Sequence, residues 1–101
     1  MLFRSAVMVH ELRKRGVRAE MEVPISVVWE NVKLDVGFKA DVIVEGIVVL
    51  ELKSIEKIAP VHKKQLLTYL RLTDCRLGLL INFGSELIKH GISRVVNGLP
   101  E

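Results

Sequence analysis

The chain has 101 residues, of which 50% are hydrophobic and 27% are charged, and its formal net charge is +3. This length suits one domain with one core, and the balance of apolar and charged residues excludes a disordered chain. The sole cysteine, Cys75, excludes an internal disulfide, the apolar runs are too short to span a membrane, and Met1 to His10 lacks a signal peptide. We therefore expect a soluble cytoplasmic protein with one domain over residues 1–101 and no membrane contact.

The N-terminal part of the chain predicts one helix followed by short strands. The segments are a helix at Leu2 to Arg15, strands at Val17 to Val23, Ile25 to Trp29 and Val32 to Phe38, and a turn at Glu30 and Asn31. Gly16 is the expected stop of the helix, because glycine readily takes the left-handed conformation that follows a helix. Pro24 lacks an N–H group, so we expect an edge strand or a bulge there.

The C-terminal part predicts a hairpin, a helix and a central strand. The hairpin runs from Ala40 to Lys53, a helix opens at Pro60 and continues to Thr73, an apolar strand covers Leu77 to Phe83, and the tail adds a helical turn and a weak strand at Ile92 to Val96. A strand this apolar suits the middle of a sheet covered on both faces, and Gly78 within it suits close packing against a helix. We predict an α/β fold with a mixed sheet, in two or three layers.

Three charged residues stand out in the otherwise aliphatic hairpin. Asp41, Glu51 and Lys53 lie on predicted strands, where a charge is costly unless a partner neutralises it. A divalent cation would explain the two acids, and a phosphodiester substrate would explain the lysine. Glu51 and Lys53 are two residues apart on one strand, so both side chains leave the same face of the sheet.

The turn of the hairpin decides whether Asp41 joins that face. A two-residue turn at Glu45 and Gly46 would pair Asp41 with Leu50, and the two acids would point apart. A three-residue loop, Val44 to Gly46 with Gly46 left-handed, pairs Ile43 with Ile47 and Asp41 with Val49. Asp41 and Glu51 then become diagonal neighbours about 7–8 Å apart on one face, near enough for a cation to bridge them. We predict the three-residue loop.

This geometry predicts a site for a hard cation, Mg²⁺ or Mn²⁺. Asp41, Glu51 and the backbone carbonyl of Leu52 are the expected ligands, because such cations prefer oxygen and keep several waters. A bound water becomes more acidic and can act as the nucleophile, and Lys53 would orient it or neutralise charge on the phosphate. A surface Glu–Lys pair with an Asp at a strand start explains the same spacing equally well.

The spacing Asp, nine residues, then Glu-x-Lys resembles the core motif of the PD-(D/E)XK nuclease superfamily. Within it the sequence is most similar to the GxxExxY family. The matching blocks are Glu11 to Val17, Val32 to Asp41, Glu51 to Lys53, Gln65 to Leu70 and Leu77 to Gly84. The resemblance covers nearly the whole chain, and the blocks in this order are more specific than any one of them.

The resemblance implies a restriction-endonuclease-like core in the order α-β-β-β-α-β. It also implies Asp41, Glu51 and Lys53 as catalytic residues, with Gln65 and Tyr69 as accessory residues from the following helix. The Gly-x-x-Glu-x-x-Tyr segment of the family should open the first helix, and Met1 to Ser5 does not fit it. Either the chain is truncated at its N-terminus, as we expect, or the site is incomplete.

The expected function is metal-dependent hydrolysis of phosphodiester bonds in nucleic acid, with DNA as the expected substrate. The alternative is a module that binds nucleic acid or assembles with other proteins, retaining the nuclease fold without catalysis. Two basic clusters suit phosphate contacts, namely Lys57, Lys63, Lys64 and Arg71 near the site, and Arg13, Lys14, Arg15 and Arg18 at and just beyond the end of the first helix, where the helix dipole also explains Arg13 to Arg15. A homodimer is a further alternative, because free sheet edges can pair between chains.

Overall fold

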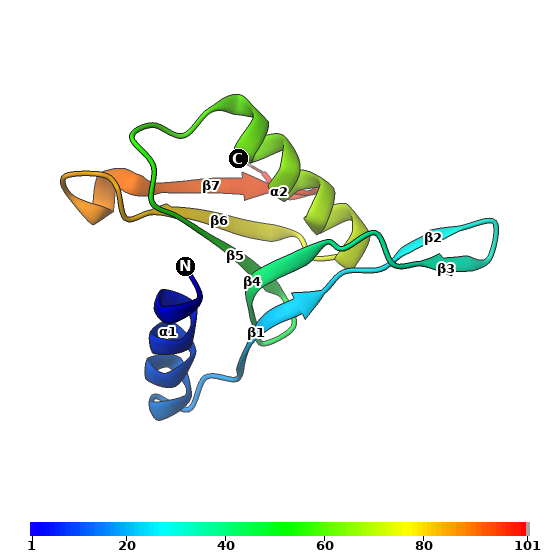
Figure 1. The fold of residues 1–101 in the computed structure, drawn as a ribbon, viewed down its shortest axis with the longest axis horizontal. Helices are drawn as coiled ribbons and strands as arrows, with labels where there is room; N and C mark the ends of the chain where they lie inside the picture. The colour runs from blue at the N-terminus through cyan, green and yellow to red at the C-terminus, as the bar shows by residue number, and fades with distance from the viewer. Residues whose placement is uncertain (101) are drawn as a thin grey trace.

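The computed structural model describes residues 1–100 and shows a mixed sheet with a helix on each face (Figure 1). Its elements are α1 (Leu2–Lys14), β1 (Ala19–Pro24), β2 (Val27–Trp29), β3 (Val32–Leu34), β4 (Lys39–Val44), β5 (Val48–Lys53), α2 (Pro60–Thr73), β6 (Leu77–Asn82), the 3-10 helix η1 (Ile88–Gly91) and β7 (Ile92–Val96). The arrangement has three layers, which resolves the choice between two and three. Over residues 1–100, no helix has the length and apolarity needed to cross a membrane.

The sheet has the strand order β1-β4-β5-β6-β7. Strands β5 and β6 are parallel, and the other three pairs are antiparallel. Two parallel neighbours need a crossover connection, and α2 supplies it between β5 and β6. The C-terminal ends of β5 and β6 therefore meet at the edge of the sheet where α2 begins.

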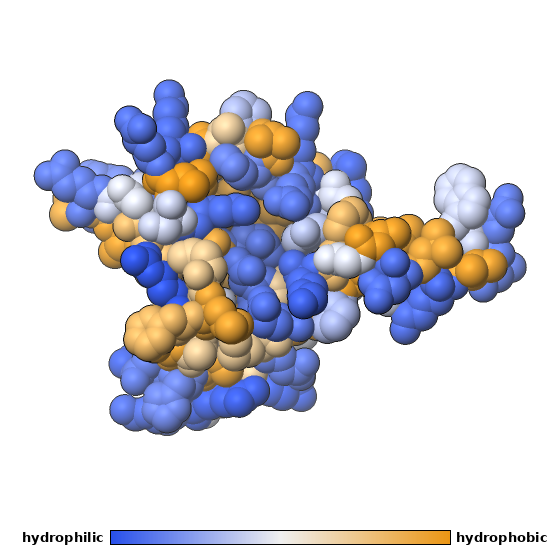
Figure 2. Space-filling view, in the orientation of Figure 1, coloured by the Kyte–Doolittle hydropathy of each residue, from blue (hydrophilic) through white to orange (hydrophobic). Residues whose placement is uncertain are grey.

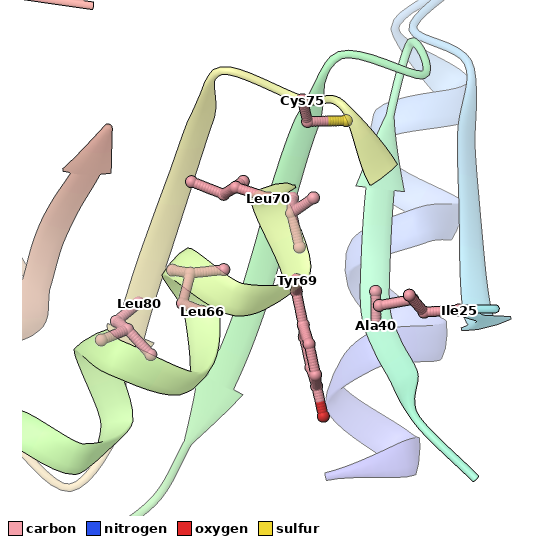
Figure 3. Packing of buried hydrophobic residues seen from close by; sticks show 8 residues of the cluster. Ile25, Ala40, Leu66, Tyr69, Leu70, Cys75 and Leu80 are labelled. Atoms are coloured by element: carbon pink, nitrogen blue, oxygen red, sulfur yellow. The ribbon is translucent and has the colours of Figure 1, made fainter. Parts of the chain in front are cut away.

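Each face of the sheet buries its own apolar cluster. On the α2 face, helix residues Leu66, Tyr69 and Leu70 pack with Val49 and Leu80 of the sheet (Figure 3). On the α1 face, Val9 packs with residues of the opposite strand parity, among them Val42, Leu50 and Leu52. Successive side chains of a strand point to opposite faces, so the alternating apolar residues of β4 and β5 supply both clusters.

The first helix and the first strand follow the predicted order, with one boundary of each corrected. The helix ends at Lys14, and Gly16 is left-handed after it with φ +78°. The first strand starts at Ala19 rather than Val17, and its ladder is distorted at Glu22, which has a positive φ of 52° two residues before Pro24. This strand is an edge of the sheet, as a strand ending in proline should be.

The predicted strands on either side of Glu30 and Asn31 are shorter than expected because they leave the main sheet. Strands β2 and β3 form a separate two-stranded hairpin that projects from the body, which we call the arm (residues 26–37; Figure 1). The arm begins after Ile25, whose buried side chain lies in the core and whose N–H donates to the carbonyl of Phe38 at 2.8 Å. The arm exposes several large apolar side chains beside charged and polar ones (Figure 2).

Gly78 permits the close approach of α2 to β6, as the sequence predicted. A Cβ at this position would lie 2.9 Å from the side-chain carbons of Leu66, closer than packed carbon atoms come. We expect Gly78→Ala to lower the free energy of unfolding by about 1–3 kcal/mol, because it overpacks this contact. The measurement is urea unfolding followed by circular dichroism. In the double variant Gly78→Ala with Leu66→Ala the two losses should be less than additive, and full additivity would contradict the stated contact.

Candidate functional site

The β4–β5 hairpin places Asp41 and Glu51 side by side, but in a register that differs from the predicted one. The ladder pairs Ile43 with Val49 and Val44 with Val48. Continued by one step past the pair of Val42 and Leu50, this register sets Asp41 opposite Glu51. The expected pairings of Ile43 with Ile47 and of Asp41 with Val49 are therefore wrong, although the expected shared face is confirmed.

The loop holds three residues, as predicted, but they are Glu45, Gly46 and Ile47 rather than Val44 to Gly46. Glu45 and Gly46 both have positive φ, 53° and 68°, and the N–H of Ile47 donates to the carbonyl of Val44 at 3.0 Å. The tight turn thus closes between Val44 and Ile47, and Ile47 becomes the extra exposed residue. Gly46 is left-handed as expected.

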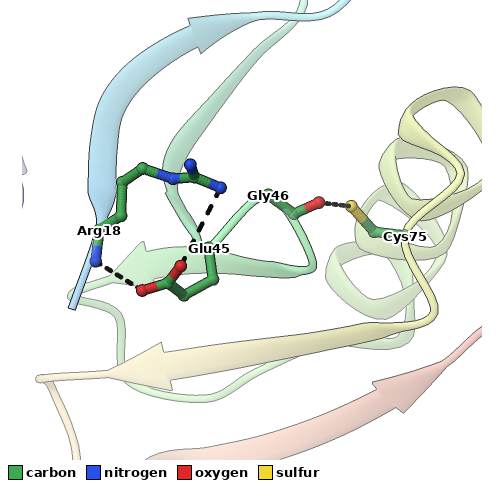
Figure 4. A network of polar contacts seen from close by, with 4 residues as sticks. All are labelled: Arg18, Glu45, Gly46 and Cys75. Carbon is green, nitrogen blue, oxygen red and sulfur yellow. Dashed lines mark hydrogen bonds and ion pairs between the residues drawn. The ribbon is translucent and has the colours of Figure 1, made fainter.

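The residue that fixes this turn comes from outside the hairpin. The N–H of Arg18 donates to the Glu45 carboxylate at 2.7 Å, and the N–H of Glu45 donates to the carbonyl of Arg18 at 2.8 Å. An ion pair of 4.0 Å joins the same two side chains (Figure 4). On the other side of the turn, the thiol of Cys75 donates to the carbonyl of Gly46 at 3.5 Å. These contacts hold Glu45 in its left-handed conformation.

The two carboxylates replace hydrogen bonds of the sheet ladder. The N–H of Leu52 donates to Oδ2 of Asp41 at 2.7 Å, and the N–H of Asp41 donates to Oε1 of Glu51 at 3.3 Å. The paired residues of β4 and β5 end at Val42 and Leu50, so both acids lie where the two strands stop pairing. Backbone groups that would otherwise be orphaned hold the carboxylates in place.

Glu51 is a buried acid, with 6% of its surface exposed. Burial and then the negative charge of Asp41 raise its pKa to about 8, against the opposing effects of the N–H of Asp41 and the charge of Lys53. A carboxyl group in this position holds its proton at neutral pH unless a cation neutralises it. Burial of Glu51 therefore means that its carboxylate is stable in the ionised form only beside a positive charge.

Tyr69 and Gln65 of α2 reach the same place. Tyr69 is 5% exposed, and its hydroxyl points away from the apolar cluster, on the side of α2 that faces β4 (Figure 3). Its pKa is raised by burial and then by the charges of Glu51 and Asp41, which places the phenol close to both acids. Nε2 of Gln65 donates to the Tyr69 hydroxyl at 3.2 Å, so the phenolic proton is free to be donated elsewhere.

Asn82 is a polar residue of this region that sequence reasoning missed. It lies opposite Lys53 in the parallel ladder, and its side chain is buried. Its Oδ1 accepts from the N–H groups of Ile55 and Gly84, both at 3.0 Å, and its Nδ2 donates to the carbonyl of Ile55 at 2.9 Å. Asn82 thereby fixes the chain that leaves Lys53. In the sequence, the feature that could have identified Asn82 is that it is the one amide near the end of an apolar strand.

The donor set fits a hard divalent cation through oxygen atoms. Asp41 and Glu51 supply carboxylates, and the N–H of Leu52 points into the gap between β4 and β5, so its carbonyl oxygen points to the same side. Within residues 1–100, the acidic, histidine and cysteine side chains form no group of three that could hold a metal. His62 belongs to the helix cap instead, where its Nδ1 accepts from the N–H of Ala59 at 2.9 Å.

The fold and the motif agree with comparisons to known proteins. The sequence profile described as "PD-(D/E)XK nuclease superfamily" matches residues 3–95. The crystal structure of SSO0001 superposes with a TM-score of 0.69 at 21% sequence identity, covering 97% of this chain and 50% of that one, so this chain spans half the length of SSO0001. None of the curated proteins compared with the chain matches it. Since the profile matches nearly all of the sequence, the chain belongs to the PD-(D/E)XK nuclease superfamily.

Proposed function

We propose that the chain hydrolyses phosphodiester bonds in nucleic acid, with DNA as the expected substrate, using a divalent cation held by Asp41 and Glu51. The observation that carries this proposal is the pair of carboxylates held by backbone N–H groups at the point where β4 and β5 part. One of the two acids is buried with a raised pKa, an arrangement that a structural surface pair does not need. Membership of the nuclease superfamily supports a nucleic-acid substrate and a divalent metal.

The residues around the carboxylates suit this chemistry. Asp41, Glu51 and the carbonyl oxygen of Leu52 would hold Mg²⁺ or Mn²⁺, since these ions prefer oxygen ligands. When bound, the cation would supply an acidified water and positive charge beside the phosphate. Lys53, half-buried on the same face of β5, would position the attacking water or neutralise charge on the phosphate. Tyr69, kept protonated by its raised pKa, would donate to a phosphate oxygen, and Gln65 would hold the phenol in place.

Isothermal titration with Mg²⁺ and Mn²⁺ tests the proposal on the wild type, Asp41→Ala and Asp35→Ala. Asp35 is an exposed acid of the arm, so its replacement is the matched control. We expect the wild type and Asp35→Ala to bind the cation and Asp41→Ala to lose binding. Metal-dependent cleavage of labelled DNA should fall by at least about 100-fold in Asp41→Ala alone, because loss of a direct ligand exceeds the cost of a supporting contact. Cleavage that survives in Asp41→Ala would refute the assigned site.

A non-catalytic module that retains the fold is the second candidate. One observation favours it, namely that within residues 1–100 only two side-chain acids meet at the site. Equal and negligible binding of both cations by the wild type and Asp41→Ala, together with retained binding of nucleic acid, would support the module. We also infer a cytoplasmic location, because buried Cys75 is free and suits a reducing compartment. The free edges β1 and β7 make a homodimer the alternative quaternary state.

A further inference from the structure

A groove with a basic rim lies between α2 and β7, away from the paired acids. It encloses about 530 Å³ and is lined by Lys63, Lys64, Leu67, Arg94, Val95 and Val96. Half of these residues are cations and none is an acid. Lys63 also lines a neighbouring hollow of about 270 Å³, which contains Lys57, His90 and one acid, Glu56. The two depressions therefore follow one another along this flank of α2.

The cations of the groove are not neutralised by nearby acids. The ion pairs formed by residues 1–100 join Lys14 and Arg15 to Glu11, and Arg18 to Glu45, all distant from the groove in the fold. Helix α2 contains no acid from Pro60 to Thr73. Arg94 is held in position because its Nη1 donates to the carbonyl of Pro100 at 3.1 Å, which leaves most of its donors free.

This pattern differs from that of an ordinary solvated face, where charges of both signs alternate. Positive charges along an open groove suit a polyanion whose phosphates follow one another. The apolar floor of Leu67, Val95 and Val96 suits the sugars between the phosphates. The groove lining contains no aromatic side chain, so it offers no platform for stacking bases, and its cations suit contacts to the phosphates.

The position of the groove relative to Asp41 and Glu51 is fixed by α2 and the sheet. Gln65 and Tyr69 leave the flank of α2 that faces the acids, whereas Lys63 and Leu67 line the groove toward β7. Strand β7 is two places from β5 in the sheet, or about 10 Å at normal strand spacing. A nucleic-acid strand of a few nucleotides can therefore contact both flanks by crossing the N-terminal half of α2.

We propose that the groove between α2 and β7 holds a nucleic-acid strand by its phosphates through Lys63, Lys64 and Arg94, and so guides the strand toward Asp41 and Glu51. The inference rests on the proposed function for the identity of the polyanion. It also separates the two basic clusters of the sequence, since Lys14, Arg15 and Arg18 near the end of α1 form ion pairs, whereas the groove cations form none among residues 1–100.

Two variants with equal changes in charge test the proposal. The groove variant carries Lys63→Gln, Lys64→Gln and Arg94→Gln, and the control carries Lys14→Gln, Arg15→Gln and Lys33→Gln, three exposed cations away from the groove. Each removes three positive charges and takes the formal net charge from +3 to zero. Binding of a labelled single-stranded DNA of about 20 nucleotides is measured by fluorescence anisotropy in EDTA, at about 50–200 mM salt.

We expect the groove variant to bind at least about 10-fold more weakly and its salt slope to fall by about 2, since each lost contact to a single strand removes about 0.7. The control should change by less than about 3-fold, and Lys63→Arg with Lys64→Arg and Arg94→Lys should retain binding. Equal weakening in both charge variants, or none in the groove variant, would overturn the proposal. Mg²⁺ titration of the same proteins reports on Asp41 and Glu51 separately, so failure of the groove is distinguishable from failure of the proposed function.

Discussion

Replacing Glu51 with glutamine is expected to abolish cation binding and cleavage while making the metal-free protein more stable at alkaline pH. Glutamine matches the size of the protonated acid, so the packing around it is kept, but it cannot supply a negative charge. Activity should fall by at least about 100-fold. Such an exchange of stability for function is expected where a buried charge is kept for chemistry.

The sign of the pH dependence follows from the pKa of Glu51. Its folded pKa of about 8 lies above the ordinary value of 4.5, so between these pH values the folded state binds more protons than the unfolded state. The free energy of unfolding of the metal-free wild type should therefore fall as pH rises from about 5 to 8, by at most about 1.4 kcal/mol per pH unit from this group. Above pH 8, the ionised Glu51 lowers the free energy of unfolding by its full amount.

Urea unfolding between about pH 5 and 9 in EDTA measures this dependence, with the Glu51→Gln slope subtracted from that of the wild type. Glu20→Gln is the matched control, because Glu20 is an exposed acid on edge strand β1 and its replacement should leave slope and activity unchanged. Saturating Mg²⁺ should remove the excess slope from the wild type alone, since a bound cation keeps Glu51 ionised. A Glu51→Gln variant less stable than the wild type at pH 9 would contradict the buried-charge account.

Asn82→Ala is expected to lower the free energy of unfolding by about 3 kcal/mol. Its side chain makes three buried hydrogen bonds to backbone groups, and each contributes about 1 kcal/mol, so their loss leaves Ile55 and Gly84 with unsatisfied groups. That is a large part of the 5–15 kcal/mol that stabilises a typical domain. The measurement is urea unfolding at neutral pH.

Asn97→Ala is the matched control, because Asn97 makes one side-chain hydrogen bond, from its Nδ2 to the carbonyl of Cys75 at 3.1 Å. Its loss should be about 1 kcal/mol. Asn82→Ala should also reduce cleavage in protein that is still folded, because Asn82 fixes the residues that follow Lys53. Equal stability losses in the two variants would show that the contacts to Ile55 do not contribute as described.

The sequence contained most of the fold because the elements carry strong local signals. Alternation and aliphatic runs marked β4, β5 and β6, Pro60 marked the start of α2, and Gly16 marked the end of α1. The spacing of Asp41, Glu51 and Lys53 identified the region where the acids meet. Periodicity sufficed here because a strand fixes which side chains share a face.

The register of the hairpin was not accessible in this way. Both three-residue loops keep the parity that brings Asp41 and Glu51 together, and they differ in which residue is left exposed. Arg18 decides between them by binding Glu45 from the segment that precedes β1. Asn82 was missed for the same reason, because its partner Ile55 is 27 residues away in the chain. The arm was predicted as part of the sheet because apolar and polar residues alternate along its strands in the same way as in strands of a sheet.

The arm has a practical consequence for spectroscopy. Trp29 is the only tryptophan of the chain, and it lies at the turn of the arm with 67% of its surface exposed. Its emission therefore starts from a solvated environment in the folded protein and should change little when the core unfolds. Trp29 is paired across the arm with exposed Val32, so a molecule that covers this part of the arm should desolvate the indole and shift its emission to shorter wavelength. Intrinsic fluorescence in this protein reports on contacts of the arm, and circular dichroism reports on folding of the core.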